Sequence, residues 1–284
     1  MTEADLYILY KGMYVPNYFH TVQSLKYCEE FSFRPDDVLI TTYPKSGTTW
    51  TKEIVPLILS GGDPASVETL PNLDRTPWLE ETQACKLNLE DRSSPRILTT
   101  HLLYHWLPPS FFEVKPKVIY VMRNPKDVFT SAFHFFGMCG HLVSPSSQTD
   151  FLHKFLNRKV AYGSWFDHVK SWLNAEDKLQ MIIIYEEIIM DLKNLVTRIA
   201  KFLGKPLQAE IIENLTDRCP FNNMKKNKMS NYSTLEIMDQ TKSEFLRKGI
   251  VGDWKNQITT AEVEYFDHIY KEKMKDVNYK FIWD

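Results

Sequence analysis

Four short segments of the chain are rich in aliphatic, β-branched and aromatic residues. They span residues 38–43, 96–100, 117–122 and 180–185. Residues of these types favour strands, and runs without polar alternation are typical of strands buried on both faces of a parallel sheet. The pattern therefore predicts a central parallel sheet.

Other stretches of the chain show the periodicity of helices. One such stretch carries its large apolar side chains on a single face, namely Trp165, Phe166, Val169, Trp172 and Leu173. Residues 191–203 have a similar pattern, which ends at Gly204 and is followed by Pro206. Strands that alternate with helices predict an α/β doubly wound fold. Because no repeat or Gly/Ser linker interrupts the chain, we expect a single domain over residues 1–284.

Polar residues follow each predicted strand, at the edge where open parallel sheets bind ligands. Lys45 lies in the loop after the first strand, His101 follows the second, and Arg123 follows the third. Tyr185 ends the fourth strand. The fold should therefore collect a lysine, a histidine and an arginine at one edge of the sheet.

The loop after the first strand has the composition of an anion-binding loop. Gly47 permits a tight turn, so that the following backbone amides can point at an anion near the helix N-terminus. Ser46, Thr48 and Thr49 add hydroxyl donors, and Lys45 adds a full positive charge. We expect this P-loop-like segment to bind a phosphate or a sulfate. The alternative without a ligand is an ordinary turn in which a Ser or Thr caps the helix.

The order of residues in this loop differs from that of ATP-binding proteins. The loop GxxxxGK[ST] of those proteins has glycine before its lysine. Here Lys45 precedes Gly47, and residues 38–46 contain no glycine. A nucleoside triphosphate with magnesium, and hence a nucleotide kinase, is disfavoured.

Composition and charge exclude several classes of protein. The net charge is −2, which gives no general reason to expect nucleic-acid or membrane binding. The four cysteines, Cys28, Cys85, Cys139 and Cys219, have neither CxxC nor metal-ligand spacing, so reduced thiols and no metal are expected. The N-terminal residues are acidic where a signal peptide needs bases, and no apolar run approaches the ~20 residues that span a bilayer. A cytoplasmic protein is therefore predicted.

Three motifs resemble those of the cytosolic sulfotransferase family. TYPKSGTTW (42–50) resembles that family's 5'-phosphosulfate loop, RNPKDVFTS (123–131) its 3'-phosphate element, and RKGIVGDWK (247–255) its C-terminal signature. YGSWFDH (162–168) and NKMSNYS (227–233) are similar to segments of the hydroxysteroid branch.

The resemblance implies that the donor is 3'-phosphoadenylyl sulfate (PAPS), a nucleotide with two anionic groups. The 5'-phosphosulfate would be held by Lys45, Ser46, Gly47, Thr48 and Thr49. The 3'-phosphate would be held by Arg123, Ser131, Arg247, Lys248 and Gly249. The remaining nucleotide contacts that the resemblance implies are Trp50 and Phe221 around the adenine, with Tyr185, Cys219 and Met224 nearby. The family usually has Ser or Thr at the position of Cys219.

The same resemblance implies an in-line transfer of the sulfuryl group that needs no metal. His101 matches the catalytic base, which would take the proton of the acceptor hydroxyl. Lys45 would stabilise the charge that develops on the bridging oxygen of the donor. Ser131 would restrain Lys45 until the acceptor binds.

The resemblance places five aromatic residues around the acceptor: Phe19, Trp78, Phe135, Tyr162 and Tyr232. Such walls suit a rigid apolar ring system, which gains affinity by burial at about 25 cal/mol per Å². We therefore expect a hydroxysteroid or a similar hydrophobic alcohol as the acceptor. A phenol-type sulfotransferase and a non-catalytic carrier of steroid or nucleotide remain as alternatives. Membrane-anchored sulfotransferases that act on glycans or proteins are disfavoured by the lack of an N-terminal anchor.

The segment from Lys255 to Glu264 resembles the family's dimerisation motif and predicts a homodimer. Thr260 stands where the motif has valine. The alternative is that these residues form the N-terminus of a helix capped by Thr259 or Thr260.

Overall fold

The four predicted strands form the centre of the computed structural model, which describes residues 3–175 and 180–283. They are β3 (Val38–Thr42), β4 (Ile97–Thr100), β5 (Lys117–Met122) and β6 (Met181–Ile184). All pair in parallel, in the order β4-β3-β5-β6. The predicted α/β fold with a central parallel sheet is thus confirmed. Residues 1–2, 176–179 and 284 of the predicted single domain lie outside the described residues.

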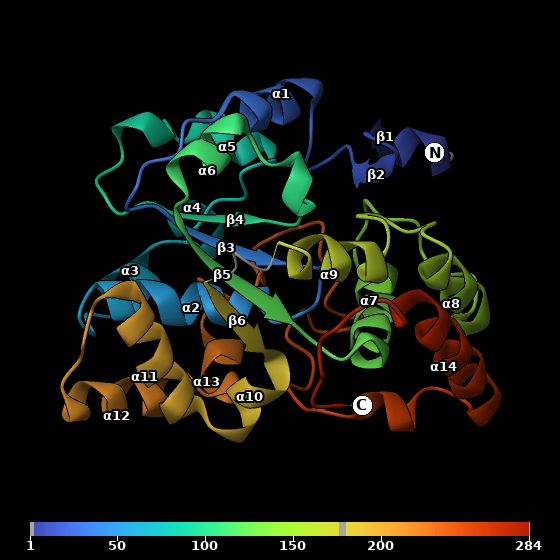
Figure 1. The fold of residues 1–284 in the computed structure, drawn as a ribbon. Helices are drawn as coiled ribbons and strands as arrows, with labels where there is room; N and C mark the ends of the chain where they lie inside the picture. The colour runs from blue at the N-terminus through green and yellow to red at the C-terminus, as the bar shows by residue number, and fades with distance from the viewer. Residues whose placement is uncertain (1–2, 176–179, 284) are drawn as a thin grey trace.

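The side chains of β5 alternate between two hydrophobic clusters, one on each face of the sheet. Val118, Tyr120 and Met122 belong to one cluster, whereas Ile119 and Val121 belong to the other. This alternation explains why the strand is apolar at every position after Lys117: each of its faces meets a layer of helices. Figure 1 shows helices on both sides of the sheet.

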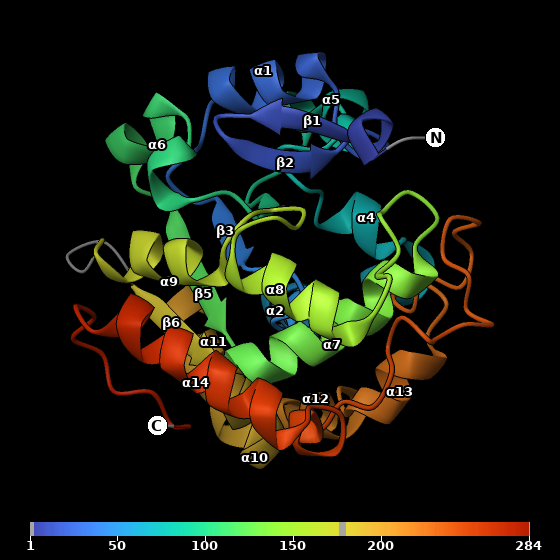
Figure 2. The same ribbon diagram turned by 90° about the vertical axis from the view of Figure 1, so that its right-hand side faces the viewer.

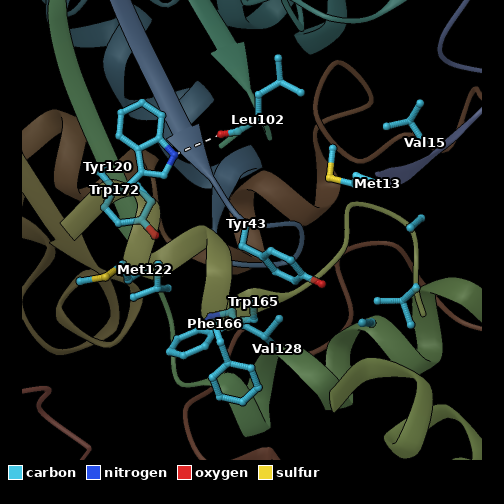
Figure 3. Close-up of a cluster of buried hydrophobic side chains, with 14 of the residues drawn as sticks. Met13, Val15, Tyr43, Leu102, Tyr120, Met122, Val128, Trp165, Phe166 and Trp172 are labelled. Carbon is cyan, nitrogen blue, oxygen red and sulfur yellow. Dashed lines mark hydrogen bonds between the residues drawn. The ribbon is translucent and has the colours of Figure 1, made fainter. Parts of the chain in front are cut away.

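Helices α2 (Thr48–Leu59) and α11 (Leu192–Leu203) cover one face. Helices α7 (Pro125–Met138) and α9 (Trp165–Leu173) contribute to the core on the other face. The apolar face predicted around Trp165 is buried in that core, and Figure 3 shows the indole of Trp172 hydrogen-bonded to the Leu102 carbonyl at 3.1 Å. Gly204 ends α11 in the left-handed conformation, as its sequence indicated.

An N-terminal hairpin was not predicted. Strands β1 (Tyr7–Tyr10) and β2 (Met13–Pro16) pair in antiparallel register, separated by Lys11 and Gly12, both with positive φ. Two consecutive positive φ angles are the signature of the tightest hairpin turns, which favour glycine. Figure 2 shows this hairpin on the same side of the molecule as α7 and α8.

The remaining elements are mostly short and connect or cover these layers. They are η1 (Glu3–Leu6), α1 (Val22–Glu30), α3 (Ala65–Thr69), α4 (Asn72–Arg75), α5 (Thr82–Lys86), η2 (Leu89–Asp91), η3 (Tyr104–Trp106), α6 (Pro109–Val114), α8 (Gln148–Leu156), α10 (Tyr185–Met190), α12 (Ala209–Arg218), α13 (Phe221–Lys226), η4 (Asp253–Asn256) and α14 (Thr260–Met274). Among the described residues, none of these helices has the length and apolarity needed to cross a membrane.

A buried ion pair joins the start of the sheet to the loops before it. The Arg96 guanidinium donates to both carboxylate oxygens of Asp37, at 2.9 and 2.6 Å, and also to the Ser32 carbonyl. Both side chains are almost fully buried. Removal of one partner would leave the other as an uncompensated charge in the protein interior.

We therefore expect Arg96→Met to lower the free energy of unfolding by about 3–5 kcal/mol, measured by urea denaturation. Lys26→Met provides the control, because Lys26 pairs with Glu30 on the surface and both side chains are about two-thirds exposed. The control should leave stability unchanged within error. If Arg96→Met is as stable as the control, the pair does not anchor the sheet.

Candidate functional site

A single cavity lies at the carboxyl edge of the sheet and gathers most of the predicted site residues. The strand order sends the chain from β3 to a helix on one face and from β5 to a helix on the other. A crevice at such a switch point is where open α/β sheets bind ligands. The predicted residues that line it are Phe19, Lys45, Gly47, Thr48, Thr49, Trp50, Trp78, His101, Arg123, Ser131, Phe135, Tyr162, Tyr185, Phe221, Met224, Tyr232, Arg247, Lys248 and Gly249.

Two predicted residues, Ser46 and Cys219, do not line the cavity. Ser46 is fully buried, and its hydroxyl has no hydrogen-bond partner within the described part of the chain. Cys219 is also buried, and it meets the site through its backbone: its carbonyl accepts a hydrogen bond from the Trp50 indole at 2.7 Å. A backbone contact explains how cysteine can occupy a position where a hydroxyl residue was expected.

The loop after β3 leaves the start of α2 open. Gly47 occupies the N-cap position with φ 104°, and no side chain caps the helix there. The alternative of an ordinary Ser or Thr cap is therefore wrong. A Cβ atom on residue 47 would lie 2.7 Å from the Tyr185 ring, so glycine is required for space as well as for conformation. The free amides of the helix N-terminus favour an anion.

Two cations meet beside this loop with no carboxylate within ion-pair distance among the described residues. The Lys45 ammonium lies 4.4 and 4.1 Å from the ring centres of Phe135 and Phe245. The Arg123 guanidinium lies 4.1 Å from the Tyr185 ring and donates to the Lys45 carbonyl at 3.1 Å. Burial, with the nearby charges of Arg123 and Arg247, lowers the pKa of Lys45 to about 7. The geometry leaves positive charge that an anionic ligand would compensate.

The position of Lys45 also bears on Ser131. Both residues line the cavity, but no hydrogen bond joins the Ser131 hydroxyl to the Lys45 ammonium in the structure as described. The ammonium lies over the two aromatic rings instead.

The C-terminal basic loop is held by two aspartates that the sequence analysis did not single out. Asp127, at the start of α7, accepts hydrogen bonds from the amides of Gly252 and Trp254 at 2.7 and 3.1 Å. Asp253 binds Arg247 and Lys248 at 2.5 and 2.6 Å. Burial tends to raise the pKa of Asp253, but the bonds from Lys248 and Arg247 outweigh it and lower the value to about 2. Asp127 lies inside the motif at residues 123–131 and Asp253 inside the motif at residues 247–255. Their place in these motifs was the signal in the sequence that could have identified them.

Trp50 and Phe221 lie against each other at one end of the cavity. Their ring centres are 5.7 Å apart and the planes are inclined by 59°. A purine stacked between two parallel rings needs about 7 Å, twice an ordinary carbon–carbon contact. Hence Phe221 must shift for the predicted sandwich to form. A side chain on Gly249 would collide with Phe221, so glycine is needed there too.

His101 is buried in a single tautomer. Its Nδ1 lies 2.6 Å from the Thr42 carbonyl, which can only accept, so Nδ1 carries the proton and Nε2 is left with a free lone pair. Burial lowers the pKa of His101 well below its usual range, partly opposed by the bond to Thr42. The ring also contacts Trp78 and Tyr162, with centres 4.2 and 5.0 Å away. The site thus holds a neutral imidazole whose Nε2 can accept a proton.

The wall around His101 is largely aromatic and apolar. Besides the five predicted residues, the sequence analysis missed several cavity residues, among them Leu73, Glu81, Leu142, Leu235, Met238 and Phe245. Most belong to loops distant in sequence, which is why no local pattern marked them. The described residues contain no group of His, Cys, Asp and Glu suited to hold a metal ion.

Comparisons with known proteins agree with this arrangement. Residues 35–278 match the model of the sulfotransferase domain. The chain is 44% identical to mouse sulfotransferase 2B1 over 98% of its own length and 83% of that protein. It is also 44% identical to guinea-pig 3-beta-hydroxysteroid sulfotransferase, over 87% and 86% of the two chains. The crystal structure of mouse sulfotransferase SULT7A1 complexed with PAP superposes with a TM-score of 0.81 at 30% identity, covering 96% of each chain. The chain therefore belongs to the sulfotransferase family and is an enzyme similar to that family's hydroxysteroid branch.

Proposed function

We propose that the enzyme transfers the sulfuryl group of PAPS to the hydroxyl of a small hydrophobic alcohol, of which a hydroxysteroid is the best candidate. One observation carries the proposal: a single cavity joins unpaired cations to an aromatic wall that holds a neutral histidine. The unpaired cations suit an anionic donor, and the aromatic wall with its neutral histidine suits an apolar acceptor that must lose a hydroxyl proton.

The residues present fit a nucleotide with two anionic groups. Lys45 and the open N-terminus of α2 would hold the 5'-phosphosulfate. Arg123 would hold the 3'-phosphate together with Ser131 and the loop of Arg247 and Lys248, because guanidinium forks suit phosphate oxygens. The product of PAPS is 3'-phosphoadenosine 5'-phosphate (PAP), and the similar crystal structure of mouse sulfotransferase SULT7A1 is a complex with PAP.

The transfer itself requires one proton acceptor and one charge stabiliser from the chain. PAPS supplies the activated sulfuryl group when it is bound. A bond forms between the acceptor oxygen and sulfur, and the bond from sulfur to the bridging phosphate oxygen breaks. His101 Nε2 takes the proton of the hydroxyl, while Lys45 stabilises the charge left on the bridging oxygen. The negative donor raises the pKa of Lys45 and so favours the charged form that this role needs.

The aromatic wall favours an alcohol with a ring system. Phe19, Trp78, Phe135, Tyr162 and Tyr232 all line the cavity, and the rings of Trp78 and Tyr162 contact His101. The name of one relative, guinea-pig 3-beta-hydroxysteroid sulfotransferase, supports a steroid rather than a simple phenol. A phenol-type sulfotransferase would differ only in its acceptor, and the acceptor assay described below distinguishes it from a steroid sulfotransferase.

We also propose a homodimer through the segment from Lys255 to Glu264. Thr259 caps α14 in a capping box with Glu262, so the helix-cap interpretation of this segment is confirmed. The side chains of Lys255, Thr260 and Glu264 are exposed, so the cap does not prevent them from contacting a partner. So short a segment buries less than the ~1,600 Å² of a standard interface, which favours a weak dimer. A cytoplasmic location remains a prediction from the sequence.

The state of His101 can be observed directly by ¹⁵N NMR of the histidine rings. Because the pKa of His101 is depressed, the ring should stay neutral between pH 6 and 8, with the proton on Nδ1. The spectrum of His101→Asn assigns the resonance. A ring that takes up a second proton near pH 6.5, or that carries its single proton on Nε2, would contradict the role as base.

The acceptor class can be tested with ³⁵S-labelled PAPS and a panel of sterol alcohols, simple alcohols and phenols. We expect the wild type to favour a sterol alcohol. His101→Ala should lower turnover on that alcohol by about 10²–10⁴-fold, the usual contribution of a general base. Turnover on an acidic nitrophenol should fall less, because a phenol loses its proton more easily.

The two acceptors are compared at saturating donor, wild type against variant. Equal losses on both would mean that His101 acts on geometry or on donor binding. A wild type that prefers small phenols would overturn the steroid assignment, and a wild type that transfers label to no acceptor would overturn the proposed function.

A further inference from the structure

Glu81 lines the cavity at its aromatic end, and the proposed reaction makes no use of it. It follows the cavity residue Trp78 by three positions, and its amide closes a turn onto the Trp78 carbonyl at 3.2 Å. Although Glu81 occupies the N-cap position of α5, its side chain does not cap that helix. Within the described structure, no hydrogen bond or ion pair engages its carboxylate. An acidic group in an aromatic cavity without a partner needs an explanation.

A second unpaired group lies close to it. Lys52, on α2, is fully buried, and its ammonium has no hydrogen-bond partner among the described residues. The ammonium lies 4.5 Å from the centre of the Trp78 ring. Burial lowers the pKa of Lys52, and the nearby charge of Glu81 works in the opposite direction. Burial also raises the pKa of Glu81, with Glu80 adding to the rise and Lys52 opposing it.

A neighbouring ion pair shows what a purely structural role looks like. Glu53, the residue after Lys52, forms a direct ion pair with Arg75, and both also bond to the Ser230 hydroxyl. Lys52 and Glu81 lack such direct contact, since no ion pair joins them within 4.0 Å in the described structure. Lys52 does not line the cavity, whereas Glu81 does. Of the two, only the carboxylate of Glu81 is placed to meet a ligand.

We propose that Glu81 determines acceptor specificity by accepting a hydrogen bond from a second hydroxyl of the acceptor, remote from the hydroxyl that is sulfated. The nearby charge of Lys52, behind the cavity wall, opposes the rise in the pKa of Glu81 and so favours the ionised carboxylate, which is the form that accepts a hydrogen bond. The cavity wall also carries side chains without polar atoms, such as Phe19 and Leu73, and a second hydroxyl buried against these would be left without a partner. This inference rests on the proposed transfer to a hydrophobic alcohol.

The test compares sterol diols with matched ketones, in which the second hydroxyl is replaced by a carbonyl of similar size that has no proton to donate. The panel places the second group at several positions of the ring system and side chain. For at least one diol, we expect the wild-type kcat/KM to exceed that of its ketone. Glu81→Leu should reduce this diol-to-ketone ratio by about 10- to 100-fold, the scale of one hydrogen bond to a charged group.

Two variants guard against a trivial loss of folding. Glu81→Gln keeps an acceptor oxygen and should retain part of the preference. Glu113→Leu removes an exposed glutamate on α6, outside the cavity, and should leave the ratio as in the wild type. Affinity for PAP, measured by calorimetry, should match the wild type in all three variants, because no ion pair or hydrogen bond joins Glu81 to Lys45 or Arg123 in the described structure and the charge of Glu81 is not among those that shift the pKa of Lys45.

The inference is overturned if no diol is preferred over its ketone, if the ketone is preferred, or if Glu81→Leu lowers both rates by the same factor. These results would leave the proposed function standing, because the simple sterol alcohol would still be sulfated. Failure of the proposed function would instead abolish transfer to every acceptor.

Discussion

Lys45 and Arg123 are held within one site, each against an aromatic ring, with no carboxylate to neutralise them among the described residues. Burial and the repulsion from neighbouring positive charges both lower the pKa of Lys45, because they disfavour its charged form. The surrounding backbone is arranged around this constraint. Gly47 and Gly249 stand where a side chain would collide with Tyr185 or Phe221, and Asp127 ties the C-terminal basic loop to the start of α7.

The same physical effect, burial, acts differently at the two ends of the cavity. At the cationic end it makes positive charge costly, and a negative ligand would offset this cost. At His101 it keeps the imidazole neutral, which is the form that a base needs. The backbone carbonyl of Thr42 then decides which nitrogen is free. One cavity can therefore offer a full charge to the donor and an uncharged lone pair to the acceptor.

Much of this could be predicted from the sequence because the signals are local. Apolar runs specify the buried strands, and the residues just after each strand must meet at one edge of a parallel sheet. Features that depend on long-range packing could not be predicted. The Trp50 indole bonds to the backbone of residue 219, a contact that the identity of Cys219 does not encode. Lys52, on α2, and Glu81, just before α5, are far apart in the sequence and come close only in the folded chain. The N-terminal hairpin was missed because its four-residue strands are too short to show a clear period.

The central claim is that the unpaired positive charge in this cavity binds an anionic nucleotide. The most direct test is thermal unfolding of the wild type and Lys45→Met, with and without PAP. The folded-state pKa of Lys45, about 7, lies below the unfolded value of about 10.4, so its charge destabilises the fold fully below pH 7 and progressively less as the pH rises above it. At pH 6.5 the account predicts that Lys45→Met raises the Tm of the free protein. It also predicts that PAP at a hundred times its wild-type Kd stabilises the wild type by about 2.7 kcal/mol and the variant by much less. A variant that is less stable than the wild type when free, yet gains as much from PAP, would contradict the account.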